Sequence, residues 1–276
     1  MDQSDANLAL KSLAEFWADM GLEEARALTV QRGTATQRVN QPRGPSLERQ
    51  PERPAGPRPP PRRLANNPVA DARRIAGEAS TLAALRSAIQ RFDGCTLKAG
   101  AKNTAVCDGA FDAPVMIVGE APGADEDIQG LPFVGRAGKL LDKMLETIGL
   151  SRKTNVYITN LVYWRPPGNR EPSTTEMEVC SPFLKRQIEL KQPKILLTAG
   201  KFATSALLNT TDGIMRLRGR KLRYTQDGLA EPIPCVPLLH PAYLLRRPED
   251  KSKAWDDLRT IAALCDQLGI KREGAL

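Results

Sequence analysis

His240 is the only histidine among the 276 residues of the chain, so no other imidazole could bind a ligand or transfer a proton. It lies in the segment VPLLHPAYLLRR (residues 236–247), after a short apolar run and directly before a proline. Histidine changes charge near neutral pH and can donate or accept a hydrogen bond. A lone histidine is nevertheless more often structural than catalytic. Its role therefore depends on which other polar side chains reach the same place.

Carboxylates are concentrated in the segment GEAPGADED (residues 119–127), where Glu120, Asp125, Glu126 and Asp127 lie in and after a glycine- and proline-rich turn. This much negative charge disfavours a phosphate, and the glycine spacing does not match the dinucleotide-binding fingerprint. Carboxylates instead suit a site where positive charge develops or where water is activated. Alternatively, Asp125 and Asp127 only begin a helix, whose N-terminus favours acidic residues.

An aromatic ring, an amide and an arginine have chemistry that suits a nucleic acid. Phe133 is either a core residue or a platform on which a planar base could stack. Asn160 offers a donor and an acceptor that match the polar edge of a pyrimidine, or it caps the following loop. Arg136 opens a predicted helix, where its guanidinium and the helix amides could meet a phosphate.

Two further segments carry arginines beside prolines or apolar residues. The loop WRPPGNREP (residues 164–172) contains Arg165 and Arg170 and could form a rim that faces DNA. The segment HPAYLLRRP places an apolar tip before two arginines, and its members are Tyr243, Leu244, Leu245, Arg246 and Arg247. An apolar wedge flanked by arginines is what an enzyme needs to extrude a nucleotide from a duplex. The alternative is that this segment is the first turn of a surface helix.

The elements that must position these residues alternate between buried strands and helices. Continuous apolar runs predict strands at residues 114–120, 155–162, 194–200 and 233–240. Helical patterns occur at residues 80–92, with Ser80 or Thr81 as the cap, and at residues 136–149, 173–191 and 201–208. The alternation indicates a parallel sheet with helices on both faces. Ligands bind such sheets beyond the carboxyl ends of the strands, where we find Glu120, Asn160, Lys201 and His240. We therefore expect His240 to belong to a site.

The N-terminal part differs in composition from the rest of the chain. Residues 1–30 hold two basic and six acidic residues and predict an amphipathic helix. Residues 31–75, rich in proline and arginine, predict a disordered linker, and residues 76–276 predict the globular domain. Because residues 1–30 carry −4 and residues 31–64 carry +6, residues 65–276 hold the remaining +6 of the net charge of +8. A basic globular part favours a polyanionic partner.

Composition and local patterns also indicate in which cellular compartment to expect the protein. No apolar run reaches the roughly 18–20 residues of a membrane span. The first residues lack the layout of a signal peptide. The five cysteines are scattered without a C-x-x-C pair, which argues against a disulfide framework or a zinc ribbon. We expect a monomeric protein in the reducing cytoplasm, with no membrane association.

Four ordered segments together resemble those of family 4 uracil-DNA glycosylases: GEAPGADED…GLPFVGRAGKLL, NVYITNLVYWRPPGNREP, KILLTAGKFA and LLHPAYLLR. The resemblance covers roughly residues 90–266 and is specific, because all four segments occur in order at suitable spacing. It implies an α/β fold, namely a three-layer αβα sandwich around a central four-stranded parallel sheet. It also implies a monofunctional hydrolase that cuts the N-glycosidic bond of flipped-out deoxyuridine in DNA and leaves an abasic site for base excision repair.

The resemblance assigns roles to residues by position. Glu120, Asn160 and His240 would be catalytic, with His240 at the O2 side of the uracil ring. The residues that hold uracil would be Gly119, Ala121, Glu126, Phe133, Asn160 and His240. We expect the residues that bind DNA to be Arg136, Arg165, Arg170, Lys201, Tyr243, Leu244, Leu245 and Arg246. Of these, the resemblance makes Leu244 or Leu245 the wedge and places Arg246 on the DNA backbone. The group that activates water stays open, because Ala121 rather than an acid follows Glu120.

The sequence departs from the family at an iron–sulfur cluster, which family 4 enzymes typically hold with four cysteines. Only Cys95 and Cys180 stand at ligand positions here, and Phe92 and Trp164 occupy the other two. A four-iron cluster requires four thiolates, and Cys107 could replace only one of the missing two. We therefore predict that the chain binds no cluster, so that it needs no cofactor, and that Phe92 and Trp164 fill the vacated volume.

Two other functions fit the same residues. With a relaxed pocket, the protein would be a glycosylase for another deaminated base. With the pocket retained only as a clamp, it would be a noncatalytic DNA-binding relative. The sequence does not determine strand preference. It also leaves open whether the N-terminal helix recruits a repair or replication protein or folds back on the domain.

Overall fold

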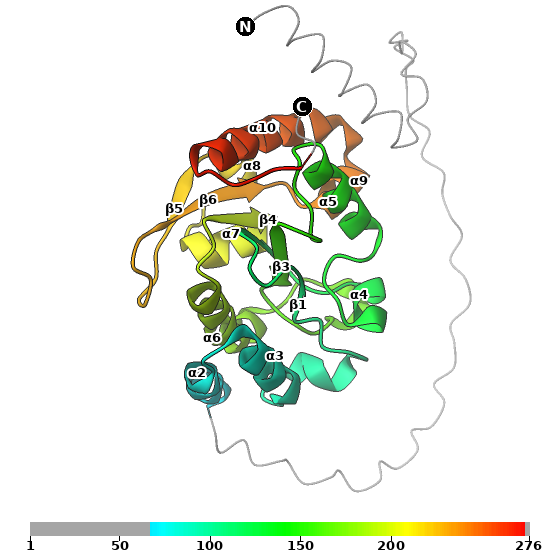
Figure 1. Cartoon of the computed structure of the whole chain (residues 1–276). Helices are drawn as coiled ribbons and strands as arrows, with labels where there is room; N and C mark the ends of the chain where they lie inside the picture. Colours follow the sequence, from blue (N-terminus) through cyan, green and yellow to red (C-terminus); the bar gives the residue numbers. More distant parts are fainter. Residues whose placement is uncertain (1–66, 274–276) are drawn as a thin grey trace, which may run out of the picture. The chain divides into compact units, whose positions relative to one another are not determined.

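The computed structural model describes residues 67–273, in which one sheet of six strands lies between two layers of helices (Figure 1). The strand order is β1–β3–β2–β4–β6–β5. The four central strands are parallel and are, in that order, β3 (Val156–Asn160), β2 (Val115–Gly119), β4 (Ile195–Ala199) and β6 (Ile233–Leu238). They correspond to the four predicted strands, and the predicted parallel sheet is confirmed.

Two short antiparallel strands extend the sheet beyond the prediction. β1 (Cys107–Gly109) pairs with β3 at one edge, and β5 (Leu222–Tyr224) pairs with β6 at the other. Each contains three residues, which is too few for an alternating pattern to show in the sequence. The sheet therefore has six strands, and its parallel centre is closed at each edge by a short antiparallel strand.

The crossover helices lie on both faces because right-handed connections that run in opposite directions along a sheet put their helices on opposite sides. The chain passes from β2 to β3 through α5 (Arg136–Glu146). It then runs the other way, through α6 (Thr174–Lys191) from β3 to β4 and through α7 (Lys201–Leu208) from β4 to β6. The three-layer architecture is confirmed.

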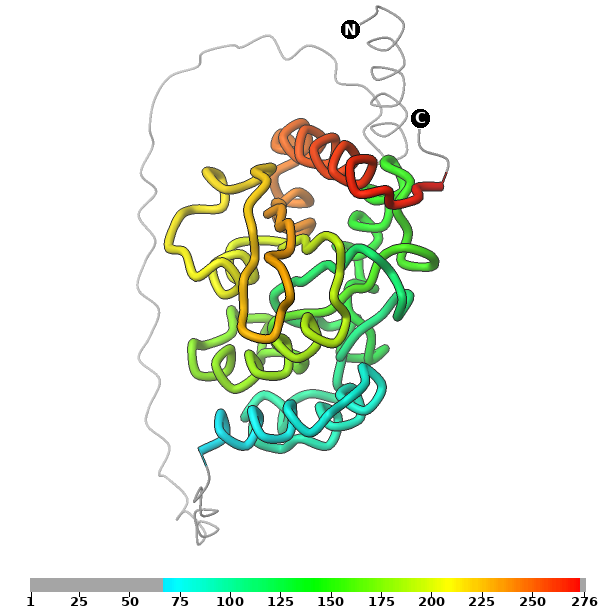
Figure 2. Tube along the Cα trace, turned by 60° about the vertical axis from the view of Figure 1, so that its left-hand side comes forward, coloured from blue at the N-terminus to red at the C-terminus, as the bar shows by residue number. Residues whose placement is uncertain are grey.

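The remaining helices complete these two layers. They are α2 (Pro68–Glu78), α3 (Leu82–Arg91), α4 (Ala124–Gln129), α8 (Ile214–Leu217), α9 (Pro241–Arg246) and α10 (Lys251–Gln267). α2 and α3 pack against α6, whereas α10 lies in the layer of α5 and α9, on the opposite side of the sheet (Figure 1 and Figure 2). The Thr81 hydroxyl caps α3, as one of the two predicted alternatives, by accepting the Ala84 N–H at 3.1 Å.

The predicted boundary between linker and domain at residue 75 is wrong, because α2 begins at Pro68. Asn67 caps this helix and accepts the Val69 N–H at 3.1 Å, while Pro68 supplies a first helical residue that needs no donor. The buried face of α2 consists of Ala72 and Ala76, so its apolar periodicity is weak in the sequence. The predicted helix within residues 1–30 and the linker up to residue 66 lie outside the described residues.

No helix within residues 67–273 combines the length and the apolar character that crossing a membrane requires.

Candidate functional site

The carboxyl ends of the four parallel strands bring the predicted polar residues to one edge of the sheet. The register pairs Gly119 of β2 with Asn160 of β3 and Ala199 of β4 with Leu238 of β6. The Gly200 N–H donates to the Leu238 carbonyl at 2.9 Å, so the chain turns away from β4 and β6 at the same level. The predicted convergence of the strand ends is confirmed.

A pocket of about 640 Å³ opens at this edge. Its wall combines the turn after β2, the loop before α5, the loop before α6, the N-termini of α7 and α9, and the start of α8. Nine of the predicted site residues line it: Glu120, Ala121, Glu126, Phe133, Arg170, Lys201, His240, Tyr243 and Arg246. Arg136, Arg165, Leu244 and Leu245 do not line this pocket, and Gly119 and Asn160 lie beneath its wall.

Gly119, Asn160 and Phe133 meet at one point below the pocket. A side-chain Cβ built on Gly119 would lie 2.4 Å from Asn160 Oδ1 and 2.4 Å from Phe133 Cε2. The absence of a side chain at Gly119 is therefore what lets the ring and the amide approach each other. Asn160 is 1% exposed, and its Oδ1 is the one buried side-chain oxygen or nitrogen within residues 67–273 that has no hydrogen-bond partner. An unpaired buried acceptor costs about 1–3 kcal/mol, so a ligand that donates to it gains that interaction.

Glu126 holds the loop that carries Phe133. Its Oε1 accepts the N–H groups of Val134 and Gly135, both at 2.9 Å, and its Oε2 accepts the Gly123 N–H at 3.0 Å. One carboxylate thus ties the loop before α5 to the turn after β2. Phe133 has a positive φ of 54°, which is rare for an aromatic residue, and these hydrogen bonds help to hold it there.

Arg152 also supports this loop, a role that no sequence motif predicted. Its guanidinium donates to the Phe133 carbonyl at 2.7 Å and to the Pro132 carbonyl at 3.2 Å. Two carboxylates hold the guanidinium in turn: Asp108 at 2.7 Å and Asp142 at 2.8 Å. The Phe133 ring is therefore fixed before any ligand arrives.

Asp125 and Asp127 begin a helix, as the second of the two alternatives predicted, because both lie in the first turn of α4. Asp127 is buried and accepts the N–H groups of Lys102 at 2.8 Å and Asn103 at 3.3 Å. Asp125 is exposed, and neither carboxylate lines the pocket.

His240 presents a hydrogen-bond donor to the pocket. Its Nδ1 accepts the Ala242 N–H at 3.1 Å and thereby caps α9, so the proton of the neutral ring sits on Nε2. Burial, together with the nearby Arg246 cation, lowers the pKa of His240 to about 4. The imidazole is therefore neutral at physiological pH. Its ring stacks against Phe133, with 5.7 Å between the ring centroids and 29° between the planes.

Glu120 is the acid of the pocket whose protonation changes near neutral pH. It follows β2 directly and is partly buried in the pocket wall. Burial raises the pKa of Glu120 to about 7, and the nearby Glu171 carboxylate contributes to the increase. At this pKa, the carboxylate can accept a proton from water in a substantial fraction of the molecules.

Cationic side chains surround the pocket mouth. Arg170, Lys201 and Arg246 line the pocket and are exposed. Arg170 forms a two-pronged ion pair with Glu176, with N···O distances of 2.6 and 2.9 Å, and this pair lowers the pKa of Glu176 to about 2. Arg165 does not line the pocket, but its Nε donates to Oδ1 of Asn169, which does, at 2.7 Å.

The predicted apolar wedge at residues 243–245 is wrong for Leu244. Pro241 begins α9, and because residues three apart lie on the same face of a helix, Leu244 turns inward with Pro241 and is 0% exposed. Leu245 is only partly exposed, and the Tyr243 hydroxyl is bound to Asp250. The segment is the first turn of a helix, which was the alternative interpretation.

The residues at the four implied cluster-ligand positions do not fit a four-iron cluster. Cys95 and Cys180 are both buried, and their thiols share a hydrogen bond that lowers the pKa of Cys95 and raises that of Cys180. Phe92 is buried with its ring against that of Phe183, and the buried Trp164 donates to Thr104 Oγ1 at 3.0 Å.

The other cysteines do not complete a ligand set. Cys107 is a residue of β1, where the Tyr157 hydroxyl interacts with its thiol. Within residues 67–273, no three His, Cys, Asp or Glu side chains are grouped so that they could hold a metal ion.

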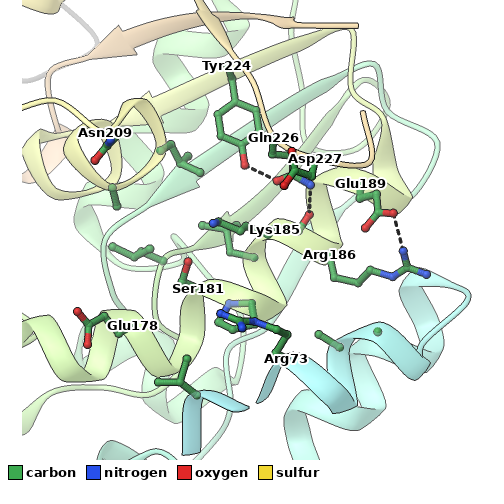
Figure 3. Close-up of a pocket in the computed structure, with 18 of the residues that line it drawn as sticks. Arg73, Glu178, Ser181, Lys185, Arg186, Glu189, Asn209, Tyr224, Gln226 and Asp227 are labelled. Atoms are coloured by element: carbon green, nitrogen blue, oxygen red, sulfur yellow. Dashed lines mark hydrogen bonds and ion pairs between the residues drawn. The ribbon is translucent and has the colours of Figure 1, made fainter. Parts of the chain in front are cut away.

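A larger hollow of about 1020 Å³ lies between α2, α6 and residues 224–227 (Figure 3). Some of its polar groups are bound to one another: the Tyr224 hydroxyl to Gln226, the Gln226 amide to the Lys185 carbonyl, and Arg186 to Glu189. None of the predicted site residues line it. We therefore place the functional site in the smaller pocket.

Comparison with known proteins agrees with the geometry. A family model described as the uracil DNA glycosylase superfamily matches residues 107–259. The type-4 uracil-DNA glycosylase of Archaeoglobus fulgidus is 40% identical over 161 residues, which cover 57% of this chain and 79% of that protein. The enzyme of the same name from Saccharolobus solfataricus is 40% identical over 178 residues, covering 63% and 81%. That from Sulfurisphaera tokodaii is 39% identical over 175 residues, covering 62% and 78%.

Proposed function

The chain belongs to the uracil DNA glycosylase superfamily, and we propose that it hydrolyses the bond between uracil and deoxyribose in DNA. The observation that carries the proposal is the meeting of Asn160 and Phe133 at Gly119, with the His240 ring stacked on that of Phe133. Together they offer a buried acceptor, a flat apolar face and a neutral donor. A uracil ring presents the complementary set, namely an N3–H donor, a flat face and two carbonyl acceptors.

Asn160 supports the choice of uracil over cytosine. Its unpaired Oδ1 can accept the N3–H of uracil, whereas cytosine presents a lone pair at N3. Two acceptors facing each other in a buried site lose a hydrogen bond and leave both groups unsatisfied. A site built in this way rejects the wrong base strongly.

His240 would stabilise the leaving group. When the glycosidic bond breaks, the electron pair goes to the base, and the negative charge is shared with O2. The Nε2–H of the neutral imidazole can donate to O2 and strengthens that hydrogen bond as the charge develops. A neutral donor suffices, so the lowered pKa of His240 is compatible with this role.

Glu120 would orient the attacking water. Its carboxylate lies in the pocket wall, and its pKa of about 7 permits it to take a proton as the water oxygen bonds to C1′ of the sugar. The products are then an abasic sugar and a uracil anion that takes a proton from solvent. The exposed cations Arg170, Lys201 and Arg246 would bind the phosphates around the extruded nucleotide.

We propose that this chemistry proceeds without an iron–sulfur cluster, since only two of the four implied ligands are thiols. Phe92 and Trp164, both buried, would fill the space that the cluster occupies in relatives. A monomeric state, a cytoplasmic location, a role in base excision repair and a protein partner for residues 1–30 stay predictions.

Incubation with uracil-containing oligonucleotides, single-stranded and paired, followed by alkaline cleavage, tests the proposal. We expect strand breaks at uracil, and we expect Asn160→Ala and His240→Ala to lose turnover while DNA binding is largely retained. A hypoxanthine-containing oligonucleotide in parallel distinguishes a glycosylase for another base. If no base yields an abasic product, the protein is a noncatalytic DNA-binding relative.

A further inference from the structure

Met215 lies at the mouth of the pocket with its side chain 46% exposed. Three large apolar side chains within residues 67–273 are exposed to this degree, and the other two are Phe111 and Ile128. Of these three, Met215 alone lines the pocket, beside Ile214 and Lys201. Single exposed apolar side chains are common on protein surfaces, so what distinguishes Met215 from Phe111 and Ile128 is its place in the pocket lining.

The short helix that carries Met215 is firmly attached to the protein. Leu217, at the other end of α8, is buried, and α8 packs against β6. The following residue, Arg218, pairs with Asp257 at 2.6 Å and donates its backbone N–H to the Ile214 carbonyl at 2.8 Å. The backbone at Met215 is therefore held in place while its side chain projects into solvent.

A base that leaves a duplex creates a gap, and its neighbours lose their stacking partner. Enzymes compensate by inserting an apolar side chain into the base stack. Of the residues first expected to do so, Leu244 is fully buried and the Tyr243 hydroxyl is bound to Asp250. Leu245 is partly exposed but does not line the pocket. Met215 is exposed, unbranched and flexible, which suits the irregular space between base pairs.

We propose that Met215 enters the DNA duplex at the position that the target nucleotide vacates. This inference rests on the proposed function, because it presupposes that a nucleotide enters the pocket. Charge supports a duplex as the occupant: Lys201 and Arg246 line the same mouth, and the side chain of the adjacent Arg216 is 81% exposed. An apolar tip among cations matches a base stack bordered by phosphates.

The test compares duplex with single-stranded substrate, since only the duplex presents paired, stacked bases that resist extrusion. We expect Met215→Ala to lower the ratio of kcat/KM on duplex to kcat/KM on single strands by about tenfold or more. Met215→Leu, which conserves volume and apolar character, should restore most of the ratio. Met215→Gln, which keeps the length but adds an amide, should not restore it. Ile128→Ala is the matched control, because Ile128 is 60% exposed and lies outside the pocket, and it should leave the ratio unchanged.

A fluorescent base analogue placed beside the uracil provides a second measurement. Binding of the unaltered protein to duplex should increase the emission as the stack opens, and Met215→Ala should reduce that increase. If Met215→Ala lowers kcat/KM equally on both substrates, or leaves the ratio unchanged, Met215 is only part of the pocket wall. Activity of the unaltered protein on single strands but not on duplex would also refute the inference. Inactivity on both substrates would instead refute the proposed function.

Discussion

The raised pKa of Glu120 predicts quantitatively how the rate of the reaction depends on pH. With a pKa of about 7, Glu120 is ionised in about one tenth of the molecules at pH 6 and in about nine tenths at pH 8. If the ionised carboxylate accepts the proton of the attacking water, the rate of bond cleavage should rise about tenfold over this interval. His240 adds no second transition there, because its pKa of about 4 keeps the ring neutral throughout.

Single-turnover excision with excess enzyme isolates this step, and fluorescence anisotropy at each pH separates it from DNA binding. Glu171→Gln removes a like charge that helps to raise the pKa of Glu120, so the transition should move to lower pH. Glu120→Gln should lower the rate and abolish the transition. Glu178 is an exposed carboxylate at the other hollow, so Glu178→Gln is the matched control. It should change neither the rate nor the pH of the transition. A rate that is flat between pH 6 and pH 8, or a transition that survives in Glu120→Gln, would refute the assignment.

Three further predictions concern the pocket, the loop that carries Phe133 and the implied cluster. Gly119→Ala should abolish most uracil release, because its methyl group would lie 2.4 Å from both the Asn160 oxygen and the Phe133 ring, and full activity of a folded variant would contradict this. Arg152→Ala should lower the free energy of unfolding by about 3 kcal/mol, because two carboxylates and two carbonyls lose a charged partner. Urea unfolding measures this change, and a decrease below about 1 kcal/mol would contradict the prediction. Iron analysis and visible absorbance of anaerobically purified protein should show no stoichiometric cluster, and activity should survive iron chelators.

The sequence predicted the centre of the sheet and the edge at which the candidate pocket lies, because both depend on local patterns. Continuous apolar runs marked the four parallel strands, and the geometry of parallel sheets then placed Asn160 and His240 at one edge. That placement is the reason to expect His240 in a functional site rather than in a purely structural position. His240 lines the pocket and also caps a helix, so its position is compatible with both a structural role and the proposed one.

The supporting residues could not be found in this way. Arg152 is one arginine among many and belongs to no motif, and its partners Phe133 and Asp108 lie 19 and 44 positions away along the chain. Met215 lies in a helix of only four residues, too short for a periodic pattern. The error at Leu244 has the same origin, because a six-residue helix that begins at a proline resembles an extended apolar tip unless the direction of each side chain is known.

The loop at residues 165–172 explains how one wall of the pocket can be held without a metal cluster. By resemblance, this loop lies between two cluster ligands, at the positions of Trp164 and Cys180. Trp164 anchors its start through burial and its bond to Thr104. Glu176, in the first turn of α6, anchors its end by binding Arg170 and the Ser173 N–H at once. Packing and one ion pair therefore fix both ends of the segment that presents Arg170 to the pocket, which is the constraint that a cluster between those positions would supply.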